Sequence, residues 1–269
     1  MTNWTIKVLG YGKLTVPKSV ATPNLDVDLI IDYPQLGFLL QNGQENVLVD
    51  TGMSENSIVD GKAWGAPAEG GSSLVKRELA KANLTPQDIS LVIYTHLHLD
   101  HAGNCGLFQK AKHIAQKDEW KELLDPPPCA KFSGDYNQNI IPILEKLDFF
   151  AIDNDIQIAD GIKLLKTPGH TSGSQAVAVK TIGGEYYISG DNFNLKQNVS
   201  PYLTEMTTID GKTIKITPAP AGFGPAIPTA LIHNLYAWYD SVAKVKGLAK
   251  SPDFILPGHE PSLVGKTFP

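Results

Sequence analysis

The stretch Thr95–His101, "THLHLDH", decides how the rest of this sequence is interpreted. It carries four side chains that can bind a divalent metal, His96, His98, Asp100 and His101, directly after the apolar run "ISLVIY". Such a run is typical of a strand buried on both faces, and side chains two residues apart at a strand end point the same way. Imidazole nitrogen and carboxylate oxygen suit zinc and related ions. A surface histidine cluster is the alternative, but so many polar groups beside a core are costly, and we therefore predict a metal site at a sheet edge.

Further candidate ligands follow other apolar runs. His170 in "TPGH" and His259 in "LPGH" share a Pro-Gly-His turn, which indicates that both histidines do the same kind of work. Asp191 follows "YYISG" and Asp50 ends "VLVD", so both carboxylates are expected at strand ends. An aspartate there is also a common turn residue. We interpret Asp191 as a ligand and Asp50 as a residue that orients a ligand histidine.

The remaining pattern alternates between strands and helices. The first fifty residues predict strands, including a hairpin that turns at Asn42-Gly43. Apolar periodicity and helix breakers predict helices over 72–84, 117–124, 139–147 and 229–249, and strands over 156–159, 162–167, 175–181 and 185–190. This order favours two packed sheets with helices outside. His113, in a predicted strand, and His233, inside the last helix, are expected to be structural.

One domain over residues 1–269 is the simplest organisation, and its least regular part is 195–229. That segment is rich in Pro, Gly and Thr and is predicted to form an insertion or lid. Trp64, Phe193 and Phe223 are candidates to line an apolar substrate pocket, although each could equally belong to ordinary packing.

Composition narrows the class of partner. The net charge is -5 and the pI is near 5.8, so the chain has no basic footprint for nucleic acid. No apolar run is long enough to span a membrane, and the N-terminus lacks the pattern of a signal peptide, so we expect a cytoplasmic protein. Cys105 and Cys129 are expected to be free thiols, with one bridge between them left open. A small-molecule substrate is the expected partner, and a homodimer is compatible with the sequence.

Taken in order, "THLHLDH", "TPGHTSG", "SGDN" and "LPGHEP" resemble the metallo-β-lactamase superfamily, and the resemblance extends over residues 28–261. It implies an α/β fold, an αββα sandwich of two mixed β-sheets flanked by helices, with two divalent metal ions in a groove at one edge. Zinc is the expected metal, with iron or manganese as alternatives. The implied ligands are His96, His98 and His170 for one ion, Asp100, His101 and His259 for the other, and Asp191 as a bridge.

The ligand set also narrows the branch of that family. A bridging Asp191 differs from the common metallo-β-lactamases, and His98 stands where flavodiiron proteins have Glu. The layout is similar to the N-acyl-homoserine lactonase group, except that Asn194 replaces a tyrosine that contacts the substrate carbonyl there. The resemblance therefore implies a hydrolase in which a metal-bridging hydroxide opens a lactone or related ester. Asp100 would carry a proton and Asn194 would donate a hydrogen bond. Thioester or phosphodiester hydrolysis, or a mononuclear iron dioxygenase, are the alternatives.

Overall fold

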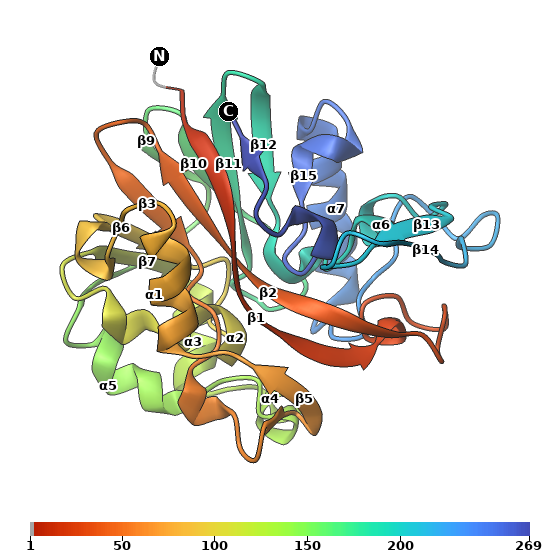
Figure 1. Cartoon of the computed structure of the whole chain (residues 1–269), viewed down its shortest axis with the longest axis horizontal. Coiled ribbons are helices and arrows are strands. Elements are labelled where there is room, and N and C mark those ends of the chain that lie inside the picture. The colour runs from red at the N-terminus through yellow and green to blue at the C-terminus, as the bar shows by residue number, and fades with distance from the viewer. Residues whose placement is uncertain (1–2) are drawn as a thin grey trace.

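Two β-sheets lie face to face, and helices cover both outer faces (Figure 1). This computed structural model describes residues 3–269. The larger sheet has the order β4-β5-β1-β2-β3-β6-β7-β8, with β16 paired to β1, and the smaller has the order β15-β12-β11-β10-β9. The larger sheet consists of β1 (Thr5–Pro17), β2 (Ile30–Gln41), β3 (Asn46–Val49), β4 (Lys62–Ala63), β5 (Ala66–Glu69), β6 (Leu91–Ile93), β7 (Lys112–Gln116), β8 (Asp148–Ile152) and β16 (Thr267–Phe268).

The smaller sheet and the helices come mostly from the second half of the chain. Its strands are β9 (Ile156–Ala159), β10 (Ile162–Lys166), β11 (Gln175–Thr181), β12 (Gly184–Ile188) and β15 (Ile255–Leu256). A separate hairpin is formed by β13 (Glu205–Thr207) and β14 (Thr213–Lys215). The helices are α1 (Ser72–Ala80), α2 (Leu99–Ala102), α3 (Lys117–Leu124), α4 (Pro128–Ser133), α5 (Ile141–Leu144), α6 (Lys196–Val199) and α7 (Leu235–Leu248). The αββα sandwich expected from the sequence is therefore confirmed.

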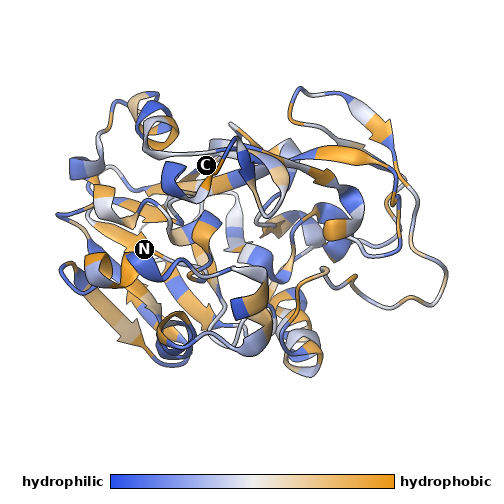
Figure 2. Cartoon of the chain, turned by 90° about the horizontal axis from the view of Figure 1, so that it is seen from below, coloured by the Kyte–Doolittle hydropathy of each residue, from blue (hydrophilic) through white to orange (hydrophobic). Residues whose placement is uncertain are grey.

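Strand alternation explains the layers. On β2, Phe38 and Leu40 point into the core between the sheets, where they join Val177 of β11. Leu39 points the other way and packs in the cluster that contains Val75 of α1. Successive side chains of a strand face opposite sides, so one strand serves two cores. Figure 2 shows the matching pattern, with hydrophobic residues concentrated on the strands of both sheets.

On the far side of the smaller sheet, α7 supplies the outer layer. Trp238 and Val242 of α7 pack with Ala176 and Ala178 of β11, which are small enough to let the helix approach closely. No helix within residues 3–269 is both long and apolar enough to cross a bilayer. Cys105 is buried and Cys129 is exposed, and the two are not bonded to each other.

Several helices are shorter than the sequence indicated. The helix predicted over 229–249 begins only at Leu235, because the side chain of Asn234 caps it by accepting a hydrogen bond of 3.1 Å from the Ala237 amide. The prediction that His233 lies inside this helix is therefore wrong, and the residue belongs to the preceding loop. Over 139–147, only Ile141–Leu144 is α-helical, after a turn of 3-10 helix. The hairpin at Asn42-Gly43 is confirmed by the antiparallel pairing of β2 and β3.

The segment 195–229 contains α6 and the β13–β14 hairpin, followed by irregular Pro-rich chain. Met206 and Ile216 in this segment pack in one cluster with Leu14 and Val16 of β1. It thus forms an arm against the outer end of β1, as Figure 1 shows. That this arm opens as a lid remains a prediction.

Candidate metal centre

Parallel strand pairs bring the candidate ligands to one edge of the sandwich. In the larger sheet β3 runs parallel to β6, so Asp50 and the Thr95–His101 stretch leave the sheet side by side. In the smaller sheet β12 runs parallel to β15, which places Asp191 and His259 together in the same way. The carboxyl ends of parallel strands are the usual location of ligand sites in α/β proteins.

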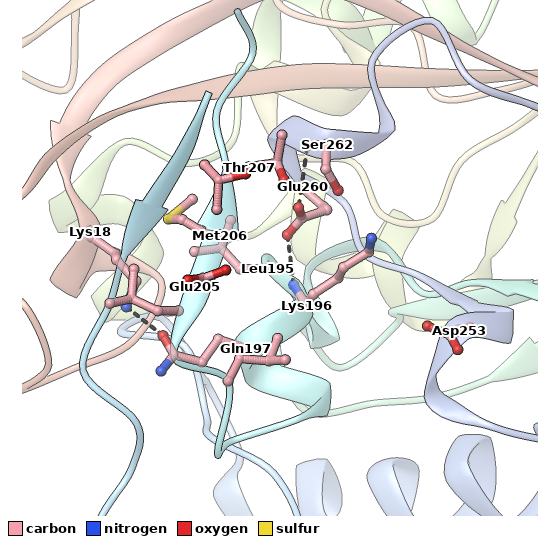
Figure 3. Close-up of a pocket in the computed structure, with 13 residues that line it drawn as sticks. Lys18, Leu195, Lys196, Gln197, Glu205, Met206, Thr207, Asp253, Glu260 and Ser262 are labelled. Carbon is pink, nitrogen blue, oxygen red and sulfur yellow. Dashed lines mark hydrogen bonds between the residues drawn. The ribbon is translucent and has the colours of Figure 1, made fainter. Parts of the chain in front are cut away.

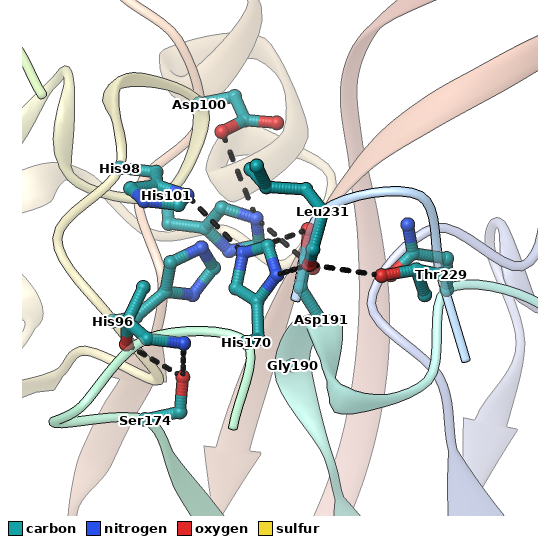
Figure 4. Close-up of polar contacts among 12 residues, drawn as sticks. His96, His98, Asp100, His101, His170, Ser174, Gly190, Asp191, Thr229 and Leu231 are labelled. Carbon is teal, nitrogen blue, oxygen red and sulfur yellow. Dashed lines mark hydrogen bonds and ion pairs between the residues drawn. The ribbon is translucent and has the colours of Figure 1, made fainter. Parts of the chain in front are cut away.

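All seven candidate ligands converge there. Figure 4 shows the imidazole rings of His96, His98, His101 and His170 gathered around Asp191. The ligand atoms form compact groups, within each of which all atoms lie within 4.8 Å of one another: His96, His98 and His170; Asp100, His101 and His259; and His96, His101 and Asp191. The first two groups have the same members as the two ligand sets that the family resemblance implies.

Asp191 lies between the two groups. Its Oδ2 atom is 3.8 Å from Nε2 of His170. Its Oδ1 atom is 3.3 Å from Nε2 of His101 and 3.1 Å from Nε2 of His259. Oδ2 is also 3.1 Å from Nε2 of His259. The carboxylate of Asp191 therefore contacts members of both groups, as a residue shared by two ions must.

Backbone carbonyls set the orientation of two of the histidines. Nδ1 of His170 is 2.7 Å from the carbonyl oxygen of Leu231, and Nδ1 of His259 is 2.8 Å from that of Pro34. A carbonyl can only accept a hydrogen bond, so each Nδ1 must carry the proton. The lone pair of Nε2 then faces the centre, as a metal ligand requires.

Asp50 does the same for His101 from behind. Its Oδ2 atom is 2.8 Å from Nδ1 of His101. The carboxylate also accepts hydrogen bonds from the backbone amide and the hydroxyl of Thr95, at 2.8 and 2.7 Å. Asp50 has a φ of 60°, a left-handed conformation uncommon for a non-glycine residue. Such strain persists only where surrounding bonds impose it, and it clusters at functional sites.

The buried polar atoms of the centre fit divalent ions. Burial, with a further contribution from neighbouring histidines, holds the pKa of His96 and of His98 well below the usual value, so both rings are neutral. Nε2 of His96, Nε2 of His101 and Oδ1 of Asp191 are buried without a hydrogen-bond partner among residues 3–269. Each unpaired buried group costs about 1–3 kcal/mol. Neutral imidazoles and carboxylates with free lone pairs are the donors that zinc-like ions accept.

Two glycines allow this packing. A Cβ on Gly258 would lie 2.5 Å from Oδ1 of Asp191. Gly190 has a φ of 52°, and a Cβ there would lie 2.7 Å from the Cβ of Thr95. Any larger residue at either position would displace the Asp191 loop.

Glu119 of α3 joins two of the ligand-bearing loops, and no motif in the sequence points to it. Its Oε1 atom accepts hydrogen bonds from the Leu97 amide at 2.9 Å and the Tyr136 hydroxyl at 2.8 Å. Its Oε2 atom accepts one from the Thr171 hydroxyl at 2.5 Å. Burial raises the pKa of Glu119 to about 7. One buried acid thus holds the loop of His96 and His98 against the loop of His170.

A cavity of about 240 Å³ opens beside the centre. Its polar lining includes His98, Asp100, His170, Asp191 and His259, together with Tyr33 and Asn194. Its apolar lining consists of Leu14, Val16, Val20, Ala63, Trp64, Ala66, Ala230 and Leu231. The cavity therefore has a polar end at the candidate ligands and an apolar end formed largely by β1 and its surroundings.

Of the three aromatic residues expected to line a pocket, the structure places only Trp64 at this cavity. Phe193 is fully buried. Its ring packs against Trp238 of α7, with ring centroids 6.3 Å apart. Phe223 is 41% exposed and lies in the irregular part of 195–229. Neither residue lines the cavity.

Tyr33 and His233 are polar neighbours that the sequence did not indicate. The ring of Tyr33 stacks on His259, with centroids 4.1 Å apart, and its hydroxyl accepts a hydrogen bond from the Asn194 amide. His233 lies 3.7 Å from Glu122 and, ring to ring, 6.2 Å from His98. Tyr33 belongs to an ordinary strand without a motif, and only the fold brings it to the site. His113 is bonded to Tyr94 and to the Phe108 carbonyl, as a structural histidine should be.

A second cavity has a volume of about 330 Å³ and is lined by residues of the β13–β14 hairpin, by α6, and by Glu260 and Ser262 (Figure 3). Lys18 at its wall is fully buried, but its ammonium group donates hydrogen bonds to Thr22 and Gln197 and forms an ion pair with Asp26. None of the residues that line this cavity is a candidate metal ligand.

Comparison with known proteins gives the family. Residues 31–259 match the model of the metallo-beta-lactamase superfamily. The chain belongs to the metallo-β-lactamase superfamily. The match extends from β2 to the last candidate ligand, so it includes all seven candidate ligands and every strand of the sandwich except β1 and β16.

Relatives within the superfamily include lactonases. The chain is 29% identical over 188 residues to an N-acyl homoserine lactonase of Bacillus sp, which covers 66% of this chain and 72% of that protein. A structure of AiiA from B. thuringiensis with bound N-decanoyl-L-homoserine aligns with a TM-score of 0.74 at 23% identity, over 96% of this chain and 94% of the other. AidC, a dizinc quorum-quenching lactonase, aligns with a TM-score of 0.66 at 16% identity, over 96% and 88%. These two structural likenesses show the shared fold.

Proposed function

We propose that this protein is a dinuclear metal-dependent hydrolase that opens the ring of a lactone carrying an apolar acyl chain. The observation that carries the proposal is the position of Asp191, between two complete ligand groups, at the polar end of a cavity whose other end is apolar. The 29% identity to a lactonase of Bacillus sp supports the choice of lactones among esters.

The chain's own residues would hold two ions, and we propose zinc because imidazole and carboxylate are its usual donors. The proposed ligands are His96, His98 and His170 for one ion, Asp100, His101 and His259 for the other, and Asp191 for both. When bound, such a pair supplies an activated water at neutral pH and polarises the substrate carbonyl.

The remaining steps fall to the protein. The apolar wall, which includes Leu14, Val16 and Trp64, would bind the acyl chain and keep water from it. Asp100 lines the same cavity and would take the proton of the attacking water and return it to the ring oxygen as the C–O bond breaks. Water is consumed and a hydroxy acid is released, so no other reactant is needed.

The test combines metal analysis with a substrate panel. Protein reconstituted with zinc is expected to retain two ions per chain after gel filtration and to hydrolyse N-acyl-homoserine lactones. Because the cavity wall is apolar, lactones with an acyl chain should exceed the unsubstituted ring in kcat/KM. Asp191→Ala should abolish hydrolysis and reduce retained metal while the far-UV circular dichroism spectrum persists.

Other outcomes would overturn the proposal. Faster hydrolysis of thioesters or phosphodiesters than of any lactone would assign the same centre to a different bond. One iron per chain with consumption of oxygen would replace hydrolysis by an oxidation. Undiminished activity in Asp191→Ala would refute a shared ligand.

A further inference from the structure

We propose that Tyr33 donates a hydrogen bond to the carbonyl oxygen of the ester that is cleaved, and that Asn194 positions its hydroxyl. The inference rests on the proposed hydrolysis of a carboxylic ester. It assigns a catalytic residue to β2, a strand that contributes none of the candidate metal ligands.

The ring of Tyr33 is fixed in place at the polar end of the cavity. It stacks on the imidazole of His259 with an interplanar angle of 17° and a centroid distance of 4.1 Å. The next residue, Pro34, accepts the Nδ1 hydrogen bond of the same histidine at 2.8 Å. Two successive residues of β2 thus hold both the face and the outer edge of a candidate ligand, so the phenol has a fixed relation to the centre.

The hydroxyl of Tyr33 has a hydrogen to spare. The side-chain amide of Asn194 donates to the phenolic oxygen, so this bond uses the oxygen and leaves the phenolic hydrogen free. No other hydrogen bond to this hydroxyl is found within residues 3–269. Both side chains line the 240 Å³ cavity, so the hydrogen can point into it.

Asn194 is itself held firmly. Its backbone amide donates to Oδ1 of Asn198 at 3.2 Å, and its carbonyl accepts from the His259 amide at 3.0 Å. These two bonds hold the backbone of Asn194 in place, and its only side-chain hydrogen bond within the described chain is the one to Tyr33. A side chain of this kind is suited to set the direction of a neighbouring hydroxyl.

The other lining residues do not offer an equivalent donor. The wall that includes Leu14, Val16 and Ala63 is apolar. Its one polar group is the indole N–H of Trp64, which hydrogen-bonds to Asp135. The remaining polar residues at the cavity are Asp135, the imidazoles and carboxylates of the centre, and Asn194, whose amide donates to Tyr33. Tyr33 thus has a neutral hydroxyl hydrogen at this cavity that no interaction within residues 3–269 already uses.

The chemistry requires such a donor. When the oxygen of water bonds to the carbonyl carbon, the π electrons move to the carbonyl oxygen, which becomes negative. A hydrogen bond aimed there is stronger in the transition state than in the bound substrate, so it raises kcat more than it lowers KM. The ring C–O bond then breaks, and the ring oxygen takes the proton that the water gave up. Tyr33 keeps its own proton throughout.

The experiment is Tyr33→Phe in the zinc-loaded enzyme. This variant keeps the ring that stacks on His259 and removes only the hydroxyl. We expect kcat for the best ester of the panel to fall about 10²–10³-fold, the loss typical of one oxyanion donor. KM and the two bound ions should change little. Tyr187→Phe is the matched control, because Tyr187 is also buried but its hydroxyl bonds to Glu185, outside the cavity.

Asn194→Ala tests the positioning role. It should lower kcat less than Tyr33→Phe does, and the double variant should be no slower than Tyr33→Phe alone, because Asn194 acts through Tyr33. Additive losses would overturn the positioning role. An unchanged kcat in Tyr33→Phe would overturn the inference while leaving the hydrolase intact. A wild-type enzyme with two ions but no activity on any carboxylic ester would overturn the proposed function and this inference together.

Discussion

Replacing Asp50 by asparagine should weaken the binding of one metal ion more than that of the other. The carboxylate of Asp50 accepts three hydrogen bonds, from the amide and hydroxyl of Thr95 and from Nδ1 of His101. Asparagine has nearly the same shape but carries only one acceptor oxygen. If that oxygen keeps the hydrogen bond from the Thr95 amide, the new NH₂ group faces Nδ1 of His101 at about the native separation of 2.8 Å. Two donors cannot share that contact.

His101 must then move its proton from Nδ1 to Nε2. The Nε2 lone pair, which lies 3.3 Å from Asp191, is lost as a ligand until the native tautomer is restored. Loss of an outer partner of this kind costs about 10–100-fold in metal affinity. That corresponds to about 1.4–2.8 kcal/mol of binding free energy. Because His101 belongs to the group with Asp100 and His259, the loss should fall mainly on that ion.

Competition of the apoprotein with a chromophoric zinc chelator measures the two affinities separately. We expect the affinity of one binding step to fall by this factor and that of the other to change less, with hydrolysis restored by excess zinc. Asp153→Asn is the matched control, since Asp153 is exposed and bonded only to Lys166 among the pairs that the structure shows. Equal weakening of both ions, or no weakening in a folded variant, would refute the tautomer argument.

Two further changes test the support of the centre. Gly258→Ala places a methyl group 2.5 Å from Oδ1 of Asp191, so the carboxylate must move. Its displacement should lower kcat about 10²-fold without unfolding the protein. A normal kcat would show that the Asp191 loop adapts freely. Burial raises the pKa of Glu119 from 4.5 to about 7. Between these pH values Glu119 binds a proton in the folded state but loses it in the unfolded state, so the free energy of unfolding falls as the pH rises. Glu119→Gln should therefore show a smaller drop in Tm than the wild type between pH 5 and pH 8; parallel Tm profiles would contradict this.

The sequence revealed the parts of the centre that are local in the chain. His96 and His98 could be paired because strand geometry turns alternate residues the same way, and the Pro-Gly-His repeats marked His170 and His259 by analogy. Phe38, Leu39 and Leu40 alternate between two cores, and the order of the predicted strands and helices favours the two packed sheets that the structure has.

What the sequence did not reveal depends on distant contacts. Tyr33 meets Asn194 across 161 residues, and Glu119 meets Thr171 across 52, so no local pattern links them. The position of His233 was predicted wrongly because apolar residues continue upstream of α7, whereas the helix begins only after its cap at Asn234. Periodicity reports which face is buried, but a single capping hydrogen bond determines where a helix begins.

The carbonyl groups behind the histidines bear on the order of folding. His259 is oriented by Pro34, 225 residues away, and His170 by Leu231, 61 residues away. Contacts so far apart in sequence form late, because the intervening chain must first be ordered. A complete binding site therefore exists only after both sheets have closed on each other. Ions that bind only this final state would stabilise the whole chain by a free energy that rises with the logarithm of their free concentration, which makes metal supply a determinant of how long the folded protein survives.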